Sequence, residues 1–191
     1  MKSPGKREGP EFEHLLGLLV NGVKSANSLV DGITNYALAL QVQRSARPVP
    51  TRALLGGVLV QLAQEIREEG AEITYDELPQ VMGDADRLMQ LFQHLLRNAI
   101  EYRGEAAPRV HIGAREEEGA WLLSVSDNGP GIDAEDLERI FRPFERLTRK
   151  REGAGLGLAI CREIVAGHQG RIWAESQVGQ GTTIYFTLGM A

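Results

Sequence analysis

Three glycine clusters in the second half of the chain carry residues that could do chemistry. They are Asp127-Asn128-Gly129-Pro130-Gly131, Gly153-Ala154-Gly155-Leu156-Gly157 and Gly179-Gln180-Gly181-Thr182. Glycine permits positive φ and close backbone approach, although a single cluster is more often a structural turn. The middle cluster runs straight into a helical pattern, so its free N–H groups and the helix dipole could receive a phosphate. It lacks the Gly-Lys-Ser or Gly-Lys-Thr of a P-loop, and it does not follow a strand as a dinucleotide-binding loop would.

An aspartate ends one of the expected strands, at an unusual place for a charge. Trp121, Leu123, Val125 and Asp127 share one parity, so alternation sends the Asp127 carboxylate toward the core face. A buried charge without a partner is costly. Asp127 is therefore a candidate ligand-binding group.

These groups must be positioned by a domain that we expect over residues 46–191. Its predicted helices cover 51–70, from a Thr51 cap to Gly70, then Asp84 or Asp86 to about Arg103, 133–141 and 156–168. Its predicted strands cover 72–75, 109–115 and 121–127, followed by two strands at the C-terminal end. The pattern predicts an α+β fold, a two-layer α/β sandwich in which helices cover one face of a mixed sheet.

The first 45 residues carry a separate pattern, in which apolar residues recur at alternating spacings of four and three. The members of this seam are Phe12, Leu16, Leu19, Val23, Ala26, Val30, Ile33, Ala37 and Leu40. Such a heptad repeat is typical of a long helix packed against other helices. We expect a dimerisation helix within a first domain, residues 1–45; the alternative is that the seam packs on the chain's own globular part. Two prolines within 44–50 predict a linker.

Composition excludes several classes of protein. The chain has 191 residues, 42% of them hydrophobic, and a net charge of −5 with no basic surface, which argues against nucleic acid as a partner. It has no apolar run long enough for a membrane span and no secretory signal pattern, so we expect a cytoplasmic location. The single cysteine, Cys161, falls in an apolar helical stretch and is expected to be a buried, inert thiol.

The order of the motifs is more specific than any one of them. An asparagine late in a helix, an Asp-Gly turn, the segment Phe141-Arg142-Pro143-Phe144, a glycine-rich helix start and a Gly-Thr turn follow one another. This constellation resembles the ATP-binding domain of the superfamily that joins histidine kinases, DNA gyrase, a heat-shock chaperone and mismatch-repair ATPases. The FRPF segment narrows the resemblance to sensor histidine kinases. The stretches 141–147 and 170–176 look closest to the phytochrome-like branch.

The resemblance implies a role for each motif residue, with ATP and Mg²⁺ as the ligands. Asp127 would accept a hydrogen bond from the adenine amino group, and Asn98 would ligate the magnesium ion. Tyr102 could stack on adenine or only close the core. The remaining residues that the resemblance implies at the nucleotide are Arg103, Gly129, Gly131, Ile132, Phe141, Gly153, Gly155, Leu156, Gly157, Leu158, Thr182 and Thr183. The basic residues of the loop 145–153, which include Arg146, either form a lid over the phosphates or are simply solvated.

Three features depart from the family's pattern. His94 replaces a residue that is usually asparagine in histidine kinases and glutamate in the hydrolysing ATPases, so its catalytic role is open between proton transfer and a bond to a phosphate or water. Glu101 stands where a lysine often reaches the phosphates, unless Arg103 substitutes for it or Glu101 points outward. No phosphoacceptor histidine followed by an acid is found, because His14 precedes Leu15 and Leu16, and the first domain resembles the second helix of the acceptor hairpin.

The sequence therefore predicts the ATP-binding domain of a protein-histidine kinase in two-component signal transduction. We expect a homodimer through the N-terminal helix and a response-regulator receiver domain as partner. Three alternatives stay open: a gyrase-type ATPase, which the missing glutamate at position 94 argues against, a dimerisation module with a decayed site, and an anti-sigma-type serine kinase, which should lack the long heptad helix.

Overall fold

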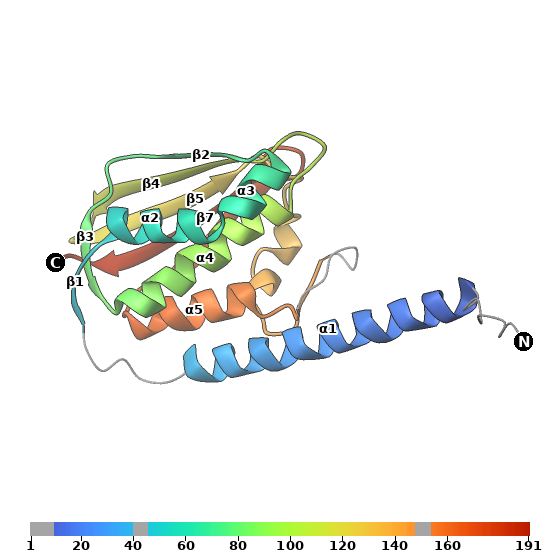
Figure 1. Cartoon of the computed structure of the whole chain (residues 1–191). Helices are drawn as coiled ribbons and strands as arrows, with labels where there is room; N and C mark the ends of the chain where they lie inside the picture. The colour runs from blue at the N-terminus through green and yellow to red at the C-terminus, as the bar shows by residue number, and fades with distance from the viewer. Residues whose placement is uncertain (1–9, 40–45, 148–153) are drawn as a thin grey trace, which may run out of the picture.

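The structure, a computed structural model, describes residues 10–39, 46–147 and 154–191. One long helix lies beside a domain in which helices cover one face of a sheet (Figure 1). The helices are α1 (Pro10–Ala39), α2 (Thr51–Gln61), α3 (Ala63–Glu69), α4 (Ala85–Glu101) and α5 (Gly157–Gly167). The strands are β1 (Arg47–Pro50), β2 (Glu72–Tyr75), β3 (Gln80–Gly83), β4 (Arg109–Glu117), β5 (Ala120–Asp127), β6 (Ile172–Gln177) and β7 (Gly181–Gly189).

The main sheet has five strands in the order β2-β4-β5-β7-β6. β2 runs parallel to β4, and the other neighbours are antiparallel, so the sheet is mixed. The predicted sandwich, a mixed sheet with helices on one face, is confirmed. In this topology the C-terminal end of β5 lies beside the start of β7, where Ser126 pairs with Thr183, so two of the three glycine clusters meet at one edge.

The hydrophobic core lies between the sheet and the helices α2, α4 and α5. Phe92 of α4 and Phe186 of β7 are fully buried and make an edge-to-face contact, with ring centroids 5.8 Å apart. α4 begins at an N-cap, Asp84, whose carboxylate accepts hydrogen bonds from the backbone N–H groups of Asp86 and Arg87 at 3.0 and 3.2 Å. This core fixes α4, which contributes four polar residues to the cavity lining.

Three predicted elements differ from the structure. The predicted helix over 51–70 is two helices, α2 and α3, separated at Leu62, and the Thr51 hydroxyl bonds the Pro79 carbonyl instead of capping the helix. The predicted linker over 44–50 is wrong for residues 47–50, which form β1 and pair with β3 in a small antiparallel sheet. Residues 133–141 form two 3-10 turns, Ala134–Asp136 and Arg139–Phe141, not one helix.

The C-terminal half of α1 packs against α5 (Figure 1). Tyr36 is partly buried against the core, Ala39 is buried, and the Arg87 guanidinium of α4 donates to the Leu38 carbonyl. The seam residues face elsewhere: Val23, Val30 and Ile33 are between 45 and 61% exposed. Within the described residues, no helix has the length and hydropathy that crossing a membrane requires.

Candidate functional site

A cavity of about 550 Å³ opens between α4, the start of α5 and the ends of β5 and β7. This volume suits a nucleotide-sized ligand. Eleven of the predicted site residues line it: His94, Asn98, Tyr102, Asp127, Gly131, Ile132, Gly155, Leu156, Gly157, Leu158 and Thr182. Residues from four separate stretches of the sequence therefore meet at one place.

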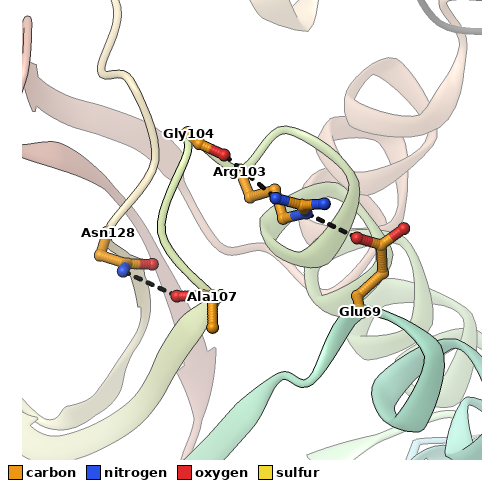
Figure 2. A network of polar contacts seen from close by, with 5 residues as sticks. All are labelled: Glu69, Arg103, Gly104, Ala107 and Asn128. Atoms are coloured by element: carbon orange, nitrogen blue, oxygen red, sulfur yellow. Dashed lines mark hydrogen bonds and ion pairs between the residues drawn. The ribbon is translucent and has the colours of Figure 1, made fainter.

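The other predicted residues lie outside the cavity lining. Arg103 turns toward α3, where its Nε donates to Glu69 Oε2 at 2.5 Å, as Figure 2 shows. Gly129 supports the site through its backbone, Phe141 is buried in the core, and the Thr183 hydroxyl lies 2.9 Å from that of Ser126. Gly153 lies outside the described residues.

Asp127 ends β5 with its carboxylate at the cavity. Its Oδ1 accepts hydrogen bonds from the backbone N–H groups of Gly129, at 2.8 Å, and Thr182, at 3.2 Å. Burial raises the pKa of this carboxyl above its usual value, and the two hydrogen bonds oppose that rise. Because both bonds come from backbone groups, the orientation of the carboxylate is fixed by folding before any ligand arrives.

Two glycines allow the backbone segments around Asp127 to pack in close contact. Gly131 has a φ of 73°, and a Cβ there would lie 2.1 Å from the Gln177 carbonyl oxygen. Gly181 has a φ of 91°, and a Cβ there would lie 2.0 Å from the carbonyl oxygen of Asp127 itself. No other residue type fits either position without moving the backbone. Figure 2 shows a further tie, in which the Asn128 side chain donates to the Ala107 carbonyl at 3.0 Å.

Four side chains of α4 face the cavity from one side of the helix: His94, Arg97, Asn98 and Glu101. Burial, together with the positive charge of the nearby Arg97, lowers the pKa of His94 to about 4. The imidazole is consequently neutral at pH 7. A Cβ built on Gly157 would lie 3.6 Å from His94 Nδ1, so the ring packs against the first residue of α5.

The start of α5 and the segment before it form the end of the cavity away from Asp127. α5 has no side-chain cap, which leaves its first backbone N–H groups for a ligand or water. Arg146 lines the same end, and its Nε and Nη2 atoms are buried without a hydrogen-bond partner among the described residues. Buried polar groups are normally paired, and an unpaired guanidinium calls for an anion. These residues fit a phosphate group.

Sequence reasoning missed Arg97 and left Arg146 undecided. Arg97 follows His94 by three positions and precedes Glu101 by four, a spacing that places all of them on one helix face. That helical spacing was the sequence signal that could have identified Arg97 as a residue of the cavity. No periodicity marks Arg146, because it follows a 3-10 turn in an irregular segment.

A fixed carboxylate at one end of the cavity and an uncapped helix start with a buried guanidinium at the other define a nucleotide-binding domain. The profile of the family described as histidine kinase-, DNA gyrase B-, and HSP90-like ATPase matches residues 83–191. The chain belongs to this family.

Two further comparisons narrow the family to sensor histidine kinases. The chain is 46% identical to cyanobacterial phytochrome A of Nostoc sp. over 171 residues, which cover 88% of this chain but 22% of that protein. Full-length ShkA in complex with AMPPNP has a TM-score of 0.77 at 28% identity, covering 96% of this chain and 40% of that one. The chain spans about a fifth of the length of its phytochrome relative.

A third similarity is to the crystal structure of histidine kinase ThkA in complex with response regulator protein TrrA. Its TM-score is 0.72 at 25% identity, and the match covers 100% of this chain and 53% of that one. The fold and the relatives together are those of the ATP-binding catalytic domain of a sensor histidine kinase.

Proposed function

We propose that this chain binds Mg-ATP in the cavity and presents the γ-phosphoryl group to a histidine in two-component signalling. The observation that carries the proposal is the polarity of the cavity: the Asp127 carboxylate at one end, and the Arg146 guanidinium beside the start of α5 at the other. A carboxylate suits the amino group of adenine. Unpaired guanidinium and helix N–H groups suit phosphates.

The predicted roles follow this polarity. Asp127 and Thr182 bind the base, with Gly129, Gly131 and Ile132 shaping its loop and Tyr102 beside it. Asn98 holds the magnesium ion from α4 through its amide oxygen, a hard ligand. The ion neutralises charge on the phosphates, and the chain's own residues supply position. Around the phosphates we place Gly153, Gly155, Leu156, Gly157 and Leu158, with Phe141 and Thr183 supporting the site from the core and from β7.

His94 acts as a neutral hydrogen-bonding group in this proposal. With a pKa of about 4 it carries no proton to donate as an imidazolium at pH 7, and it is a weak base. We therefore assign it a bond to a phosphate oxygen or to a water molecule. This choice separates the chain from ATPases that use glutamate as a general base at the same position.

Asp127→Asn tests the base end. The amide presents a donor where the carboxylate only accepts, so ATP binding should weaken by about 1.5 to 3 kcal/mol, the worth of a charge-assisted hydrogen bond. Asp133→Asn makes the same chemical change six residues along, on an exposed side chain outside the cavity, and should leave affinity unchanged. Equal affinity of both variants by calorimetry would remove Asp127 from the site.

The exposed seam of α1 supports a homodimer. Gly32, Tyr36 and Ala39 pack toward the domain, whereas Val23 and Val30 lie on the opposite side of the helix and are exposed. Val23→Glu with Val30→Glu should give monomers in sedimentation, because both charges would enter the seam. Asp31→Lys changes the charge at an exposed position off the seam and should leave the dimer intact. A dimer that survives the double variant contradicts the assignment.

The chain is expected to bind nucleotide without labelling itself. On β4, the His111 ring bonds the Thr74 hydroxyl and its Nε2 lies 3.4 Å from Asp76 Oδ1, and His168 bonds the Ile164 carbonyl; neither residue lines the cavity. The side chain of His14 lies outside the described part. Labelled Mg-ATP should leave no acid-labile phosphate on the chain, and labelling should appear when a helix with a histidine-acid pair is supplied. Phosphohistidine formed on the chain alone would contradict this expectation.

A response-regulator receiver domain as partner and a cytoplasmic location remain part of the proposal.

A further inference from the structure

The position on α4 where the family often has a lysine that reaches the phosphates carries Glu101 in this chain. Glu101 lines the cavity. Arg103, the candidate substitute, is bound to Glu69 outside the cavity (Figure 2). Among the described residues, Arg97 and Arg146 are the two cationic side chains that line it.

Arg97 is held in a fixed orientation by α3. Its Nε donates to Glu65 Oε2 at 3.1 Å and its Nη2 donates to Glu65 Oε1 at 3.0 Å, a bidentate pair. A guanidinium has five N–H donors, so this pair leaves donors on Nη1 and Nη2 beyond those that face Glu65. The Arg97 side chain is 37% exposed, so a ligand in the cavity can reach it.

The charged and titratable groups near Arg97 indicate that it lies at the phosphate end of the cavity. The hydrogen bond that Arg97 donates to Glu65 raises the pKa of Arg97 most, and the charge of Glu101 raises it further, so the guanidinium interacts with two carboxylates. It is also close enough to His94 to lower the pKa of the imidazole. Arg97 therefore lies among the residues that face the start of α5.

We propose that Arg97 binds the terminal phosphates of the nucleotide, with Glu65 as the residue that positions it. The inference rests on the proposed nucleotide site and deepens it, because it makes Arg97 the residue that distinguishes a nucleoside triphosphate from the bare nucleoside. A polyphosphate near Glu65 and Glu101 would meet two negative charges without this cation. The bidentate pair with Glu65 holds the guanidinium at the cavity in one orientation.

A matched pair of arginines tests the assignment. Arg97–Glu65 and Arg103–Glu69 both tie α4 and the residues after it to α3, but only Arg97 lines the cavity. Arg97→Gln should weaken ATP binding about tenfold, the size expected for a lost charged hydrogen bond, and leave adenosine binding unchanged. Arg103→Gln should change neither. ATP affinity is measured by calorimetry and adenosine affinity by NMR titration.

A second substitution distinguishes the loss of a positive charge at the phosphates from the loss of a contact between α3 and α4. Glu101→Lys in the Arg97→Gln background returns a cation to the same helix face one turn along and should recover most of the lost ATP affinity. A structural clamp between α3 and α4 would not be restored by that lysine.

Each outcome decides the inference. Selective loss of ATP binding in Arg97→Gln, with rescue by Glu101→Lys, supports it. Loss of adenosine and ATP together, equal effects of Arg97→Gln and Arg103→Gln, or absence of rescue overturns it. If the unsubstituted chain binds neither ATP nor adenosine, the proposed nucleotide site fails as well, whereas normal ATP binding by Arg97→Gln removes the role of Arg97 alone.

Discussion

The two ends of the cavity are built in different ways. At the Asp127 end, the carboxylate is bonded to two backbone N–H groups and the surrounding loops touch through Gly131 and Gly181. At the α5 end, the helix start has no side-chain cap and the Arg146 Nε and Nη2 atoms have no hydrogen-bond partner. The first end is completed by folding, and the second keeps polar groups that a ligand would complete.

Because of this difference, one end of the cavity contributes mainly to stability and the other mainly to ligand binding. The loop contacts that Gly131 and Gly181 allow at the Asp127 end stabilise the protein whether or not a ligand is present. A buried group without a partner lowers stability until an anion arrives. Substitutions of the two glycines at the Asp127 end should therefore damage the fold, and substitutions at the α5 end should mainly damage binding.

The largest expected effect comes from Gly181→Ala. The new Cβ would lie 2.0 Å from the Asp127 carbonyl oxygen at a φ of 91°, so the hairpin and β5 must separate. The free energy of unfolding should fall by about 3 kcal/mol or more, in the range of severe backbone and packing defects. Urea denaturation measures the loss.

Gly179→Ala is the matched control, because it lies two residues away in the same turn. Its φ is 82°, but a Cβ there meets nothing within 4 Å. It should cost about 1 kcal/mol, the price of a left-handed conformation alone. Similar losses in the two variants would show that contact between the loops does not hold the Asp127 end together.

Lowering the pH should change the contributions of the two ends of the cavity to folding stability in opposite directions. The pKa of His94 falls from 6.5 to about 4 on folding, so its contribution to stability is complete above about pH 6.5 and is lost as the pH falls toward 4. The loss is on the order of 2 to 3 kcal/mol. Burial raises the pKa of Asp127, so protonation of that carboxyl favours the folded state and its contribution is lost as the pH rises.

His94→Asn isolates the contribution of the α5 end to this pH dependence. The variant should lose less stability than the unsubstituted chain between pH 7 and pH 4.5 in urea denaturation. His168, whose pKa burial also lowers, acts in the same direction and is unchanged in the variant. An identical pH dependence of the two proteins would show that His94 is not held neutral by the fold.

The sequence was sufficient where a local pattern determines the structure. Strand alternation sent Asp127 toward the core face, where it lines the cavity, and the two acidic residues Asp84 and Asp86 marked the start of α4, whose N-cap is Asp84. The strands predicted at 109–115 and 121–127 are β4 and β5, and Glu118 and Gly119 take positive φ in the turn between them. The family resemblance then supplied the residues that meet at the cavity.

The sequence was insufficient where tertiary partners determine the structure. Residues 47–50 contain two prolines, yet they form β1 because β3 offers an antiparallel partner. Arg103 was a reasonable phosphate ligand by position, but Glu69 on α3 binds it instead. Neither partner can be identified from spacing along α4, because α3 and β3 reach these residues only through the fold.

The smallest expected effect on stability, and the most specific to the α5 end, comes from Arg146→Met. Methionine keeps much of the arginine's length but removes two buried atoms that have no partner, so the nucleotide-free chain should be unchanged or more stable by up to about 1 kcal/mol. The same variant should lose much of the rise in melting temperature that ATP gives, because that rise depends on affinity. Arg142→Met, on an exposed side chain outside the cavity lining, should retain the full rise. If Arg146→Met were clearly destabilised without nucleotide, the guanidinium would belong to the folded framework, and the contrast between the two ends would fail at this residue.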